Sequence, residues 1–194
     1  MGNKVDWNLI IVIALIISFI LALILIVQHQ EAKAHEVVVE MRIRDRLEIV
    51  LIKWEAGNTP LERLLTVAKD GKGLVVGIGH DVKEHDNLEL GERITINEMN
   101  TLLQTDLDEA LEHAYDLLSD GRNHPQDVRL VIAAMCYQLG RQGTSKFKKM
   151  FAAIEIRDYA AAADEMLNSK WAEQTTRRAQ NQTCLLYTSP SPRD

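Results

Sequence analysis

The chain has 194 residues, a length that allows one ordinary domain with attachments. Of these residues, 46% are hydrophobic and 26% are charged. Its 22 basic and 28 acidic residues give a net charge of −6, so no positive surplus steers it to nucleic acid, and we expect no nucleic-acid partner. Six histidines and two cysteines occur without metal-ligand spacing, so no metal site is expected.

The N-terminal part of the chain holds a long apolar run. Residues 9–27, from Leu9 to Val27, are broken only by Ser18. At about 1.5 Å per residue, a helix of this length spans roughly the 30 Å core of a bilayer. A helix that packs on the core of a small domain would keep a polar face toward water, and this run has none. We therefore interpret residues 1–28 as an uncleaved signal anchor rather than as a cleaved signal peptide, although Ala32-Lys33-Ala34 has the form of a cleavage site.

A polar linker is expected over residues 29–36, followed by an amphipathic helix that ends near Gly57. Two strand-like segments come next, residues 64–69 and 74–78, and Asp-Gly in the turn between them is a hairpin signal. Residues 81–93 form a loop. The first half of the domain is therefore expected to be a small β-containing lobe.

The second half of the domain is predicted to be helical. Thr95 and Glu98 form a capping box that opens a helix to about Ser119. Further helices are expected over residues 126–139, 146–156 and 158–169, and a last one begins near Thr175 as its N-cap. The fold class is α+β. One domain over residues 37–183 holds a small β-hairpin lobe and a larger helical lobe, and one transmembrane helix precedes it.

The C-terminal segment has a different character. Residues 184–194 can be encoded by codons that together match a transposase sequencing adapter without a mismatch. We interpret this segment as adapter-derived rather than as a natural Ser/Pro-rich tail, and expect it to pack against nothing. Its exclusion leaves Cys136 as a lone cysteine in an apolar helix, where it should act as a small buried hydrophobe.

Two short motifs carry the functional interpretation. One is Gly77-Ile78-Gly79-His80, seven residues after Asp70. The other is Ser169-Lys170-Trp171-Ala172-Glu173-Gln174-Thr175, which closes on Arg178-Ala179. Together and in this order they resemble the phage-type lysozymes, the tailed-phage endolysins of glycoside hydrolase family 24. The resemblance implies a lysozyme-like fold and hydrolysis of the β-1,4 bond between N-acetylmuramic acid and N-acetylglucosamine in peptidoglycan, with no cofactor.

Glycoside hydrolysis uses a carboxylic acid and a second carboxylate across the scissile bond. The resemblance implies that Glu55, beside Trp54 and in the step Glu55-Ala56-Gly57, is the acid, and that Asp70 in the hairpin is the second carboxylate. On the residues alone, Glu55 could equally be a solvated helix-end side chain, and Asp70 a turn residue.

The match departs from the family in its catalytic segment. Glu55 and Asp70 are fifteen residues apart, which is longer than usual, and Glu62 is a rival acid eight residues before Asp70. The threonine that the family places before the Gly-x-Gly-His run, where it helps to hold the attacking water, is replaced by Val75 or Val76. Valine keeps the shape and loses the hydroxyl.

The resemblance also implies roles for residues outside the catalytic pair. His80 is implied to pair with Asp106 as a structural ion pair. Tyr137 and Gln138 are implied to line the cleft from the helical lobe, and Gln138 is the candidate for a hydrogen bond to sugar. Arg178 is implied to reach the catalytic glutamate. Alternatively, Gln138 is a satisfied core residue and Arg178 a surface charge.

We therefore interpret the chain as a monomeric endolysin, anchored in the inner (cytoplasmic) membrane through residues 9–27 and acting on peptidoglycan glycan strands. The alternative is a tethered glycan-binding module on a catalytically degenerate lysozyme fold, which the two valines favour. Lys33, Arg42, Arg44 and Arg46 follow the span, and by the positive-inside rule they favour a cytoplasmic domain. The substrate lies outside the membrane, so we expect the catalytic domain in the periplasm.

Overall fold

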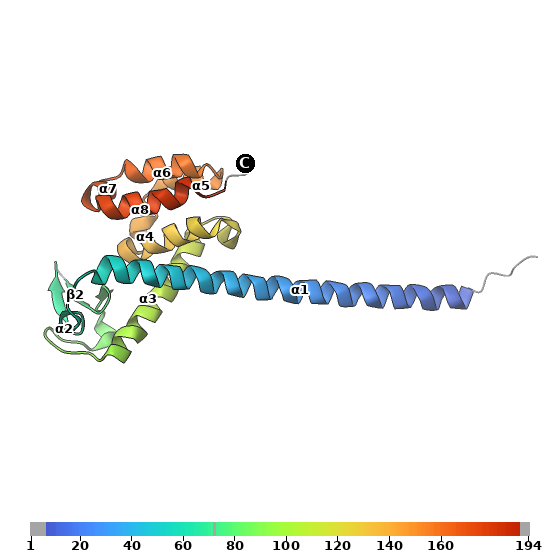
Figure 1. Cartoon of the computed structure of the whole chain (residues 1–194), viewed down its shortest axis with the longest axis horizontal. Coiled ribbons are helices and arrows are strands. Elements are labelled where there is room, and N and C mark those ends of the chain that lie inside the picture. The colour runs from blue at the N-terminus through green and yellow to red at the C-terminus, as the bar shows by residue number, and fades with distance from the viewer. Residues whose placement is uncertain (1–6, 72, 191–194) are drawn as a thin grey trace, which may run out of the picture. The chain divides into compact units, whose positions relative to one another are not determined.

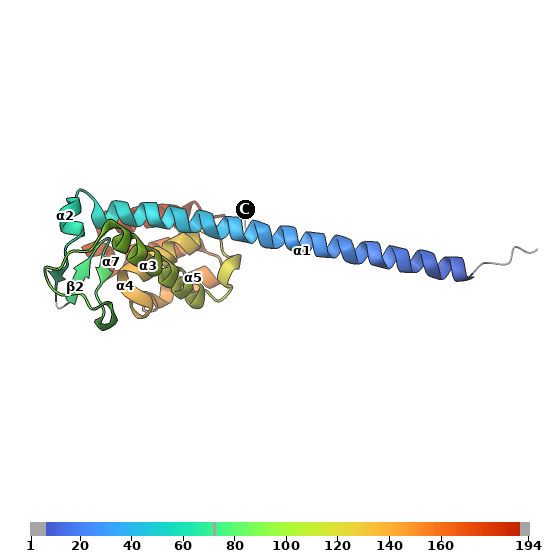
Figure 2. The same ribbon diagram turned by 90° about the horizontal axis from the view of Figure 1, so that it is seen from below.

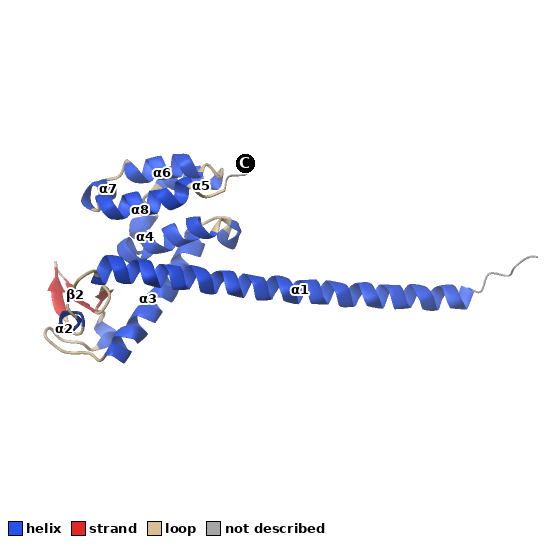
Figure 3. Cartoon of the chain, viewed as in Figure 1, coloured by secondary structure: helices blue, strands red, loops and turns tan. Residues whose placement is uncertain are grey.

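The computed structural model describes residues 7–71 and 73–190, with the side chains of residues 7–14 and 122 excepted. The chain divides into an N-terminal unit that ends at Arg42 and a second unit that begins at Ile43. Helices dominate both units, and the short strands belong to the second (Figure 3). The two units are described separately.

The N-terminal unit consists of helix α1 (Trp7–Leu51), whose last residues already belong to the second unit (Figure 1). The expectation of a linker over residues 29–36 is wrong, because this segment is helical throughout. Its Glu-Ala-Lys-Ala sequence consists of strong helix formers and contains neither glycine nor proline. A polar composition therefore did not mark a break, and the unit boundary falls later, at Arg42.

The apolar part of α1 is exposed. Leu15, Phe19 and Leu25 each keep about two thirds of their surface accessible, at 65%, 65% and 66%. On length and composition alone, the helix is long and apolar enough to cross a membrane, and none of its apolar window is buried in the protein. Such a surface is unusual for a helix in water and is typical of one that faces lipid.

The second unit begins with the end of α1 and a small antiparallel sheet. A π-helical turn η1 (Ile52–Ala56) and helix α2 (Leu61–Leu64) precede strands β1 (Ala68–Asp70), β2 (Gly73–Val76) and β3 (His80–Asp81), which pair in the order β1-β2-β3. A short 3₁₀ turn η2 (Glu84–Asp86) follows. The hairpin turn is where the sequence predicts it. Its strands are shorter than expected because Val67 pairs with the loop at Glu92 instead of with β2.

The helical lobe contains α3 (Ile96–Leu117), the 3₁₀ turn η3 (Gly121–Asn123), α4 (Gln126–Thr144), α5 (Lys148–Glu155), α6 (Tyr159–Leu167), α7 (Lys170–Gln174) and α8 (Thr176–Tyr187). Helices α5 to α8 gather together, and α3 and α4 pack side by side (Figures 1 and 2). Fully buried side chains from several of these elements form the core, among them Leu47, Leu107, Ile132, Met135, Met150 and Met166. The expected α+β architecture is confirmed.

The helix ends follow local chemistry that the sequence predicts in part. The capping box is confirmed, because the N–H of Glu98 donates to Thr95 Oγ1 at 3.2 Å and the N–H of Thr95 to Glu98 Oε2 at 2.7 Å. Gly140 adopts a φ of 66° within α4, which kinks there and continues to Thr144 instead of ending. Thr175 does not cap α8, since its hydroxyl donates to the carbonyl of Trp171 at 2.8 Å.

The C-terminal segment corrects a further expectation. Helix α8 continues to Tyr187, Leu186 is fully buried, and the Tyr187 hydroxyl donates to Asp164. The expectation that this tail packs against nothing is therefore wrong for residues 184–190, while residues 191–194 lie outside the described part. Ala179, Gln182 and Leu186 are spaced so that they share one helix face, and any apolar residue at position 186 would extend the buried stripe. An adapter origin stays a prediction.

One buried polar group ties the sheet to the helical lobe. His80, only 5% exposed, places Nδ1 at 2.8 Å from Asp106 Oδ2 and Nε2 at 3.2 Å from Asp86 Oδ2. The hydrogen bond to Asp106 raises the pKa of His80 above its usual value, although burial opposes the shift. The expected pairing of His80 with Asp106 is present and joins β3 to α3.

We expect Asp106→Asn to destabilise the protein by about 3 kcal/mol at pH 5.5, because it removes one partner of a buried ion pair. A raised pKa means that the stabilisation is complete below the unfolded histidine pKa, about 6.5, and is lost as the pH rises through the higher folded value. Urea unfolding at pH 5.5 and pH 9 should therefore show a smaller deficit at the higher pH. The exposed pair of Asp116 and Arg141 supplies the control, since Asp116→Asn should cost little at either pH. An equal deficit of Asp106→Asn at both pH values would contradict the assignment.

Candidate active site

The proposed acid lies where the first helix ends. Glu55 belongs to the π-helical turn η1, and Gly57 terminates the turn with a φ of 51°, a left-handed conformation that favours glycine. The N–H of Gly57 donates to the carbonyl of Ile52 at 3.2 Å. Single π turns occur frequently at functional sites, because they change the direction in which the following side chains point.

Glu55 is paired with the arginine that the sequence indicates. Glu55 Oε1 lies 2.8 Å from Arg178 Nη1, and the two side chains are 23% and 16% exposed. The contact is an ion pair without the alignment of a good hydrogen bond, because no donor among the described residues is aligned with Oε1. The Arg178 guanidinium also stacks 5.5 Å from the centre of the Trp54 ring. Helix α8 is thereby tied to the end of the first helix.

The Gly-Ile-Gly-His turn lies against the other side of Glu55. Gly79 has a φ of 83°, and a Cβ atom added there would lie 3.6 Å from Glu55 Cγ and 3.7 Å from Oε2. Gly77 has a φ of 67°, and a Cβ there would come within 3.1 Å of Met99. Both glycines are required by their backbone conformation, and Gly79 also keeps the space beside Glu55 Oε2 open.

The helical lobe contributes Tyr137 and Gln138, both half-buried on α4. The Tyr137 hydroxyl donates to the carbonyl of Ile78 at 2.5 Å and so fixes the turn between the two glycines. Burial, and then the negative charges of Asp106, Glu55 and Asp81, raise the pKa of Tyr137, so the hydroxyl stays protonated and remains a donor. Gln138 Oε1 accepts a hydrogen bond from Trp171 Nε1 at 3.1 Å, which leaves its amide NH₂ to face a ligand.

Gly79, Tyr137 and Gln138 border an open polar cleft of about 280 Å³. Its lining residues come from β3 and the loop after it, from α3 and from α4: Gly79, Asp81, Lys83, Asp106, Glu109, Ala110, His113, Cys136, Tyr137, Gln138, Leu139 and Gly140. Burial raises the pKa of the Cys136 thiol to about 11, so this side chain is a neutral wall and not a nucleophile. A cleft lined by hydroxyl, amide and carboxylate groups suits a ligand rich in hydroxyls.

The ionisable side chains around this cleft do not form a cluster typical of a metal site in the described part of the chain. Among the described side chains, no group of three or more His, Cys, Asp or Glu residues is placed to hold a metal ion. Two acidic side chains of the cleft form ion pairs. Asp106 pairs with His80, and Glu109 pairs with Lys83 at 3.1 Å.

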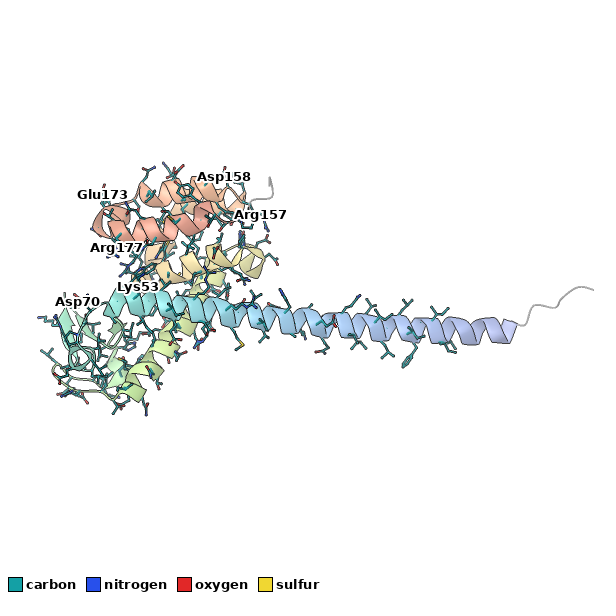
Figure 4. The ribbon with its side chains drawn as sticks, viewed as in Figure 1. Lys53, Asp70, Arg157, Asp158, Glu173 and Arg177 are labelled. Carbon is teal, nitrogen blue, oxygen red and sulfur yellow. The ribbon has the colours of Figure 1, made fainter. Side chains whose placement is uncertain are left out.

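The second candidate carboxylate lies at the end of the first strand of the hairpin. Asp70 is exposed there, pairs with Gly73 across the turn, and is labelled in Figure 4. No hydrogen bond or ion pair joins it to Glu55 among the described residues. The rival acid Glu62 is exposed in the first turn of α2 and makes no described contact with Arg178. The arginine therefore distinguishes Glu55 from Glu62, while the roles of Glu55 and Asp70 stay predictions.

The two valines occupy different environments. Val76 is buried, whereas Val75 is half-buried and pairs across the sheet with Asp81. Asp81, expected at the start of a loop, belongs to β3, and neither its place in the cleft nor the hydrogen bond between Trp171 and Gln138 was predicted from the sequence. Asp81 follows His80 directly, so the alternation of side chains along a strand could have placed it on the face opposite the buried histidine.

The sequence is similar to known proteins over most of this unit. The profile of the phage lysozyme family, described as phage lysozyme, matches residues 63–183, a stretch that includes Asp70 and Arg178 but begins after Glu55. Probable T4-type lysozyme 2 of Dictyostelium discoideum is 33% identical over 105 residues, which cover 53% of this chain and 61% of that protein. Peptidoglycan hydrolase gp36 of Pseudomonas phage phiKMV is 31% identical over 113 residues, 58% of this chain and 12% of that protein. The chain thus spans less than two thirds of the curated relatives that it matches.

Tyr137 and Tyr187 form a matched pair for testing how the turn is held. Tyr137→Phe leaves the buried carbonyl of Ile78 without its donor, and we expect a loss of about 1–2 kcal/mol in unfolding free energy. Tyr187→Phe removes a hydrogen bond to the exposed Asp164, which water can replace, so it should cost less than about 0.5 kcal/mol. Urea denaturation of both variants measures the difference. Equal losses would mean that the bond to Ile78 does not support the turn.

Proposed function

This chain belongs to the phage lysozyme family, and we propose that it is a membrane-anchored lysozyme that hydrolyses the β-1,4 bond between N-acetylmuramic acid and N-acetylglucosamine in bacterial peptidoglycan. The observation that carries the proposal is the environment of Glu55. A half-buried carboxyl stands beside a polar cleft, with one oxygen held by Arg178 and the other beside the open space at Gly79. This is the arrangement that a positioned general acid needs.

The two oxygens of Glu55 have separate tasks in the proposed reaction. Arg178 holds Oε1 and thereby fixes the orientation of the carboxyl group. Oε2 is left beside Gly79, from where it can donate its proton to the glycosidic oxygen as that oxygen leaves C1. A water molecule attacks C1 from the opposite face, assisted by a second carboxylate, for which Asp70 is the sequence-based candidate. The proposed chemistry requires no cofactor.

Tyr137 and Gln138 act in this proposal as the substrate-binding wall. With Oε1 of Gln138 engaged by Trp171, the amide NH₂ is the group that can donate to a sugar hydroxyl or an acetamido carbonyl. Tyr137 contributes indirectly, since its bond to Ile78 fixes the backbone next to Glu55.

The proposed setting is the periplasmic face of the inner membrane, where the protein acts as a monomeric endolysin. The exposed apolar side chains from Leu15 to Val27 and the length of α1 support an anchor. The positive residues that follow the span argue for the opposite orientation, and the location of peptidoglycan is the reason to place the domain outside.

A second candidate function has one observation in its favour. Val75 and Val76 carry no hydroxyl that could position the attacking water. A chain that binds glycan strands without cleaving them would retain the cleft and lose the chemistry. Introducing Val75→Thr and assaying wall lysis distinguishes the two, because a gain from zero activity identifies a degenerate module.

We expect Glu55→Gln to lower cleavage of purified peptidoglycan by roughly 100- to 10,000-fold, since glutamine keeps the shape of the side chain but has no proton to donate. Thermal unfolding should change little, because glutamine can still accept from Arg178. Asp70→Asn should cost less activity than Glu55→Gln if Asp70 only assists the water. The rate at which reducing ends are released from peptidoglycan measures the activity of the wild type, Glu55→Gln and Asp70→Asn.

Glu62→Gln is the matched control for the acid, because Glu62 is an exposed glutamate in the next helix, without contact to Arg178. It should be nearly silent. Loss of activity in Glu62→Gln together with an active Glu55→Gln would reassign the acid.

The anchor is tested by fractionation. We expect the full chain to stay in the membrane pellet after alkaline carbonate washing, because exposed apolar side chains insert favourably. Leu21→Arg combined with Leu25→Arg should release it, since each arginine near the centre of a span costs roughly 2.5–3.5 kcal/mol. A soluble wild-type protein with a new N-terminus near His35 would instead mean cleavage.

A further inference from the structure

We propose that Asp81 is a catalytic residue of the cleft, which binds the attacking water and accepts its proton. The inference rests on the proposed function and assigns the general base of the same reaction. It adds a residue that the sequence motifs do not indicate, and it makes Asp70 at the tip of the hairpin the less favourable of the two bases.

The first argument is the position of Asp81 relative to Glu55. A Cβ atom added at Gly79 would lie 3.6 Å from Glu55 Cγ, and Asp81 follows Gly79 by two residues, on β3. Successive side chains of a strand point to opposite faces, and His80 points into the protein. Asp81 therefore points away from the core, on the side where it lines the cleft together with Gly79 and Tyr137.

The second argument compares Asp81 with Asp70. Val75 pairs with Ala68 on one side and with Asp81 on the other, so these three side chains share a sheet face with Asp70. Strands are spaced by about 4.8 Å, so Asp81 and β1 lie roughly 10 Å apart across the sheet. Asp70 is two residues further along β1, at the turn. Asp81 is at the edge of the sheet that adjoins Gly79, and Asp70 is at the far edge.

The third argument is elimination among the acids of the cleft. Three acidic side chains line it, and two are neutralised: Asp106 by His80 and Glu109 by Lys83. Within the described part of the chain, no hydrogen bond or ion pair is assigned to the exposed Asp81. Its carboxylate is thus available to water, and the Val75 side chain opposite offers no competing hydrogen bond.

The bond changes balance with these two residues. The oxygen of water forms a bond to C1 of the sugar and releases a proton to Asp81. The bond from C1 to the glycosidic oxygen breaks, and that oxygen takes the proton of Glu55. Attack from the face opposite the leaving group inverts the configuration at C1, so a β-linked strand gives an α product.

The experiment measures kcat and KM on purified peptidoglycan for Asp81→Ala and Asp81→Asn. We expect kcat to fall roughly 100- to 1,000-fold with KM little changed, because the base acts in the transition state. Glu84→Ala is the control, since Glu84 is also exposed, follows three residues later and does not line the cleft. Thermal unfolding of each variant checks the fold, and Asp81→Asn preserves the size of the side chain.

Rescue of turnover by azide distinguishes a catalytic role of Asp81 from a structural one, because azide cannot replace a structural contact. In Asp81→Ala, azide can enter the space of the missing carboxylate and attack C1 in place of water, forming the C1–N bond as the C1–O bond breaks. We expect added azide to restore turnover of Asp81→Ala and to yield an α-glycosyl azide, and to have no such effect on the wild type.

Several results would overturn the proposal. A raised KM with unchanged kcat would make Asp81 a sugar-binding residue only. Azide rescue of Asp70→Ala but not of Asp81→Ala would assign the base to Asp70, and a β product from the wild type would rule out direct attack by water. An active wild type with an equally active Asp81→Ala overturns this inference alone, whereas an inactive wild type overturns the proposed function as well.

Discussion

The contact between Glu55 and Arg178 is the constraint on which the site depends. It joins the end of the first helix to a helix more than one hundred residues later in the chain. A partly exposed ion pair contributes little free energy by itself, but removing Arg178 would leave a buried carboxylate oxygen without any partner. The stacking of Arg178 on Trp54 adds a second restraint on the same guanidinium. The orientation of Glu55 is therefore determined by the helical lobe and not by its own helix.

The turn before β3, which lies next to Glu55, is held in place by side chains of the helical lobe. Strand β3 has only two residues, which is too short for its ladder to hold the turn before it. Side chains do so instead: His80 is fixed to α3 through Asp106, and Tyr137 on α4 fixes the carbonyl of Ile78. The backbone of the turn is thus held next to Glu55, and the positive φ of Gly79 is the reason that glycine is favoured at this position.

Structural features that depend on a few neighbouring residues or on a family motif could be predicted from the sequence. The capping box of Thr95 needs only two residues, and the pairs of His80 with Asp106 and Glu55 with Arg178 follow from a family pattern. Two features were not predicted, for different reasons. The polar segment after the apolar run is helical because nothing in it breaks a helix, a local signal that its polar composition obscured. Leu186 is buried because its position continues a face that other residues define, which depends on tertiary context. Asp81 was overlooked because its importance lies in its neighbours across the sheet and not in a motif.

The charges of the cleft are consistent with a substrate that is recognised without electrostatic attraction. The chain has a net charge of −6, and two of the three carboxylates that line the cleft are paired with bases, so the protein offers no attraction to an anionic polymer. The sugars of a glycan strand are bound through hydroxyl and acetamido groups, for which carboxylate and amide oxygens are good acceptors. Long-range attraction is then unnecessary if the proposed anchor holds the domain near the wall, because tethering raises the effective concentration without any charge on either partner. In this arrangement the cleft needs no surplus of positive charge to attract substrate, so a carboxylate such as the proposed base Asp81 can be kept for chemistry.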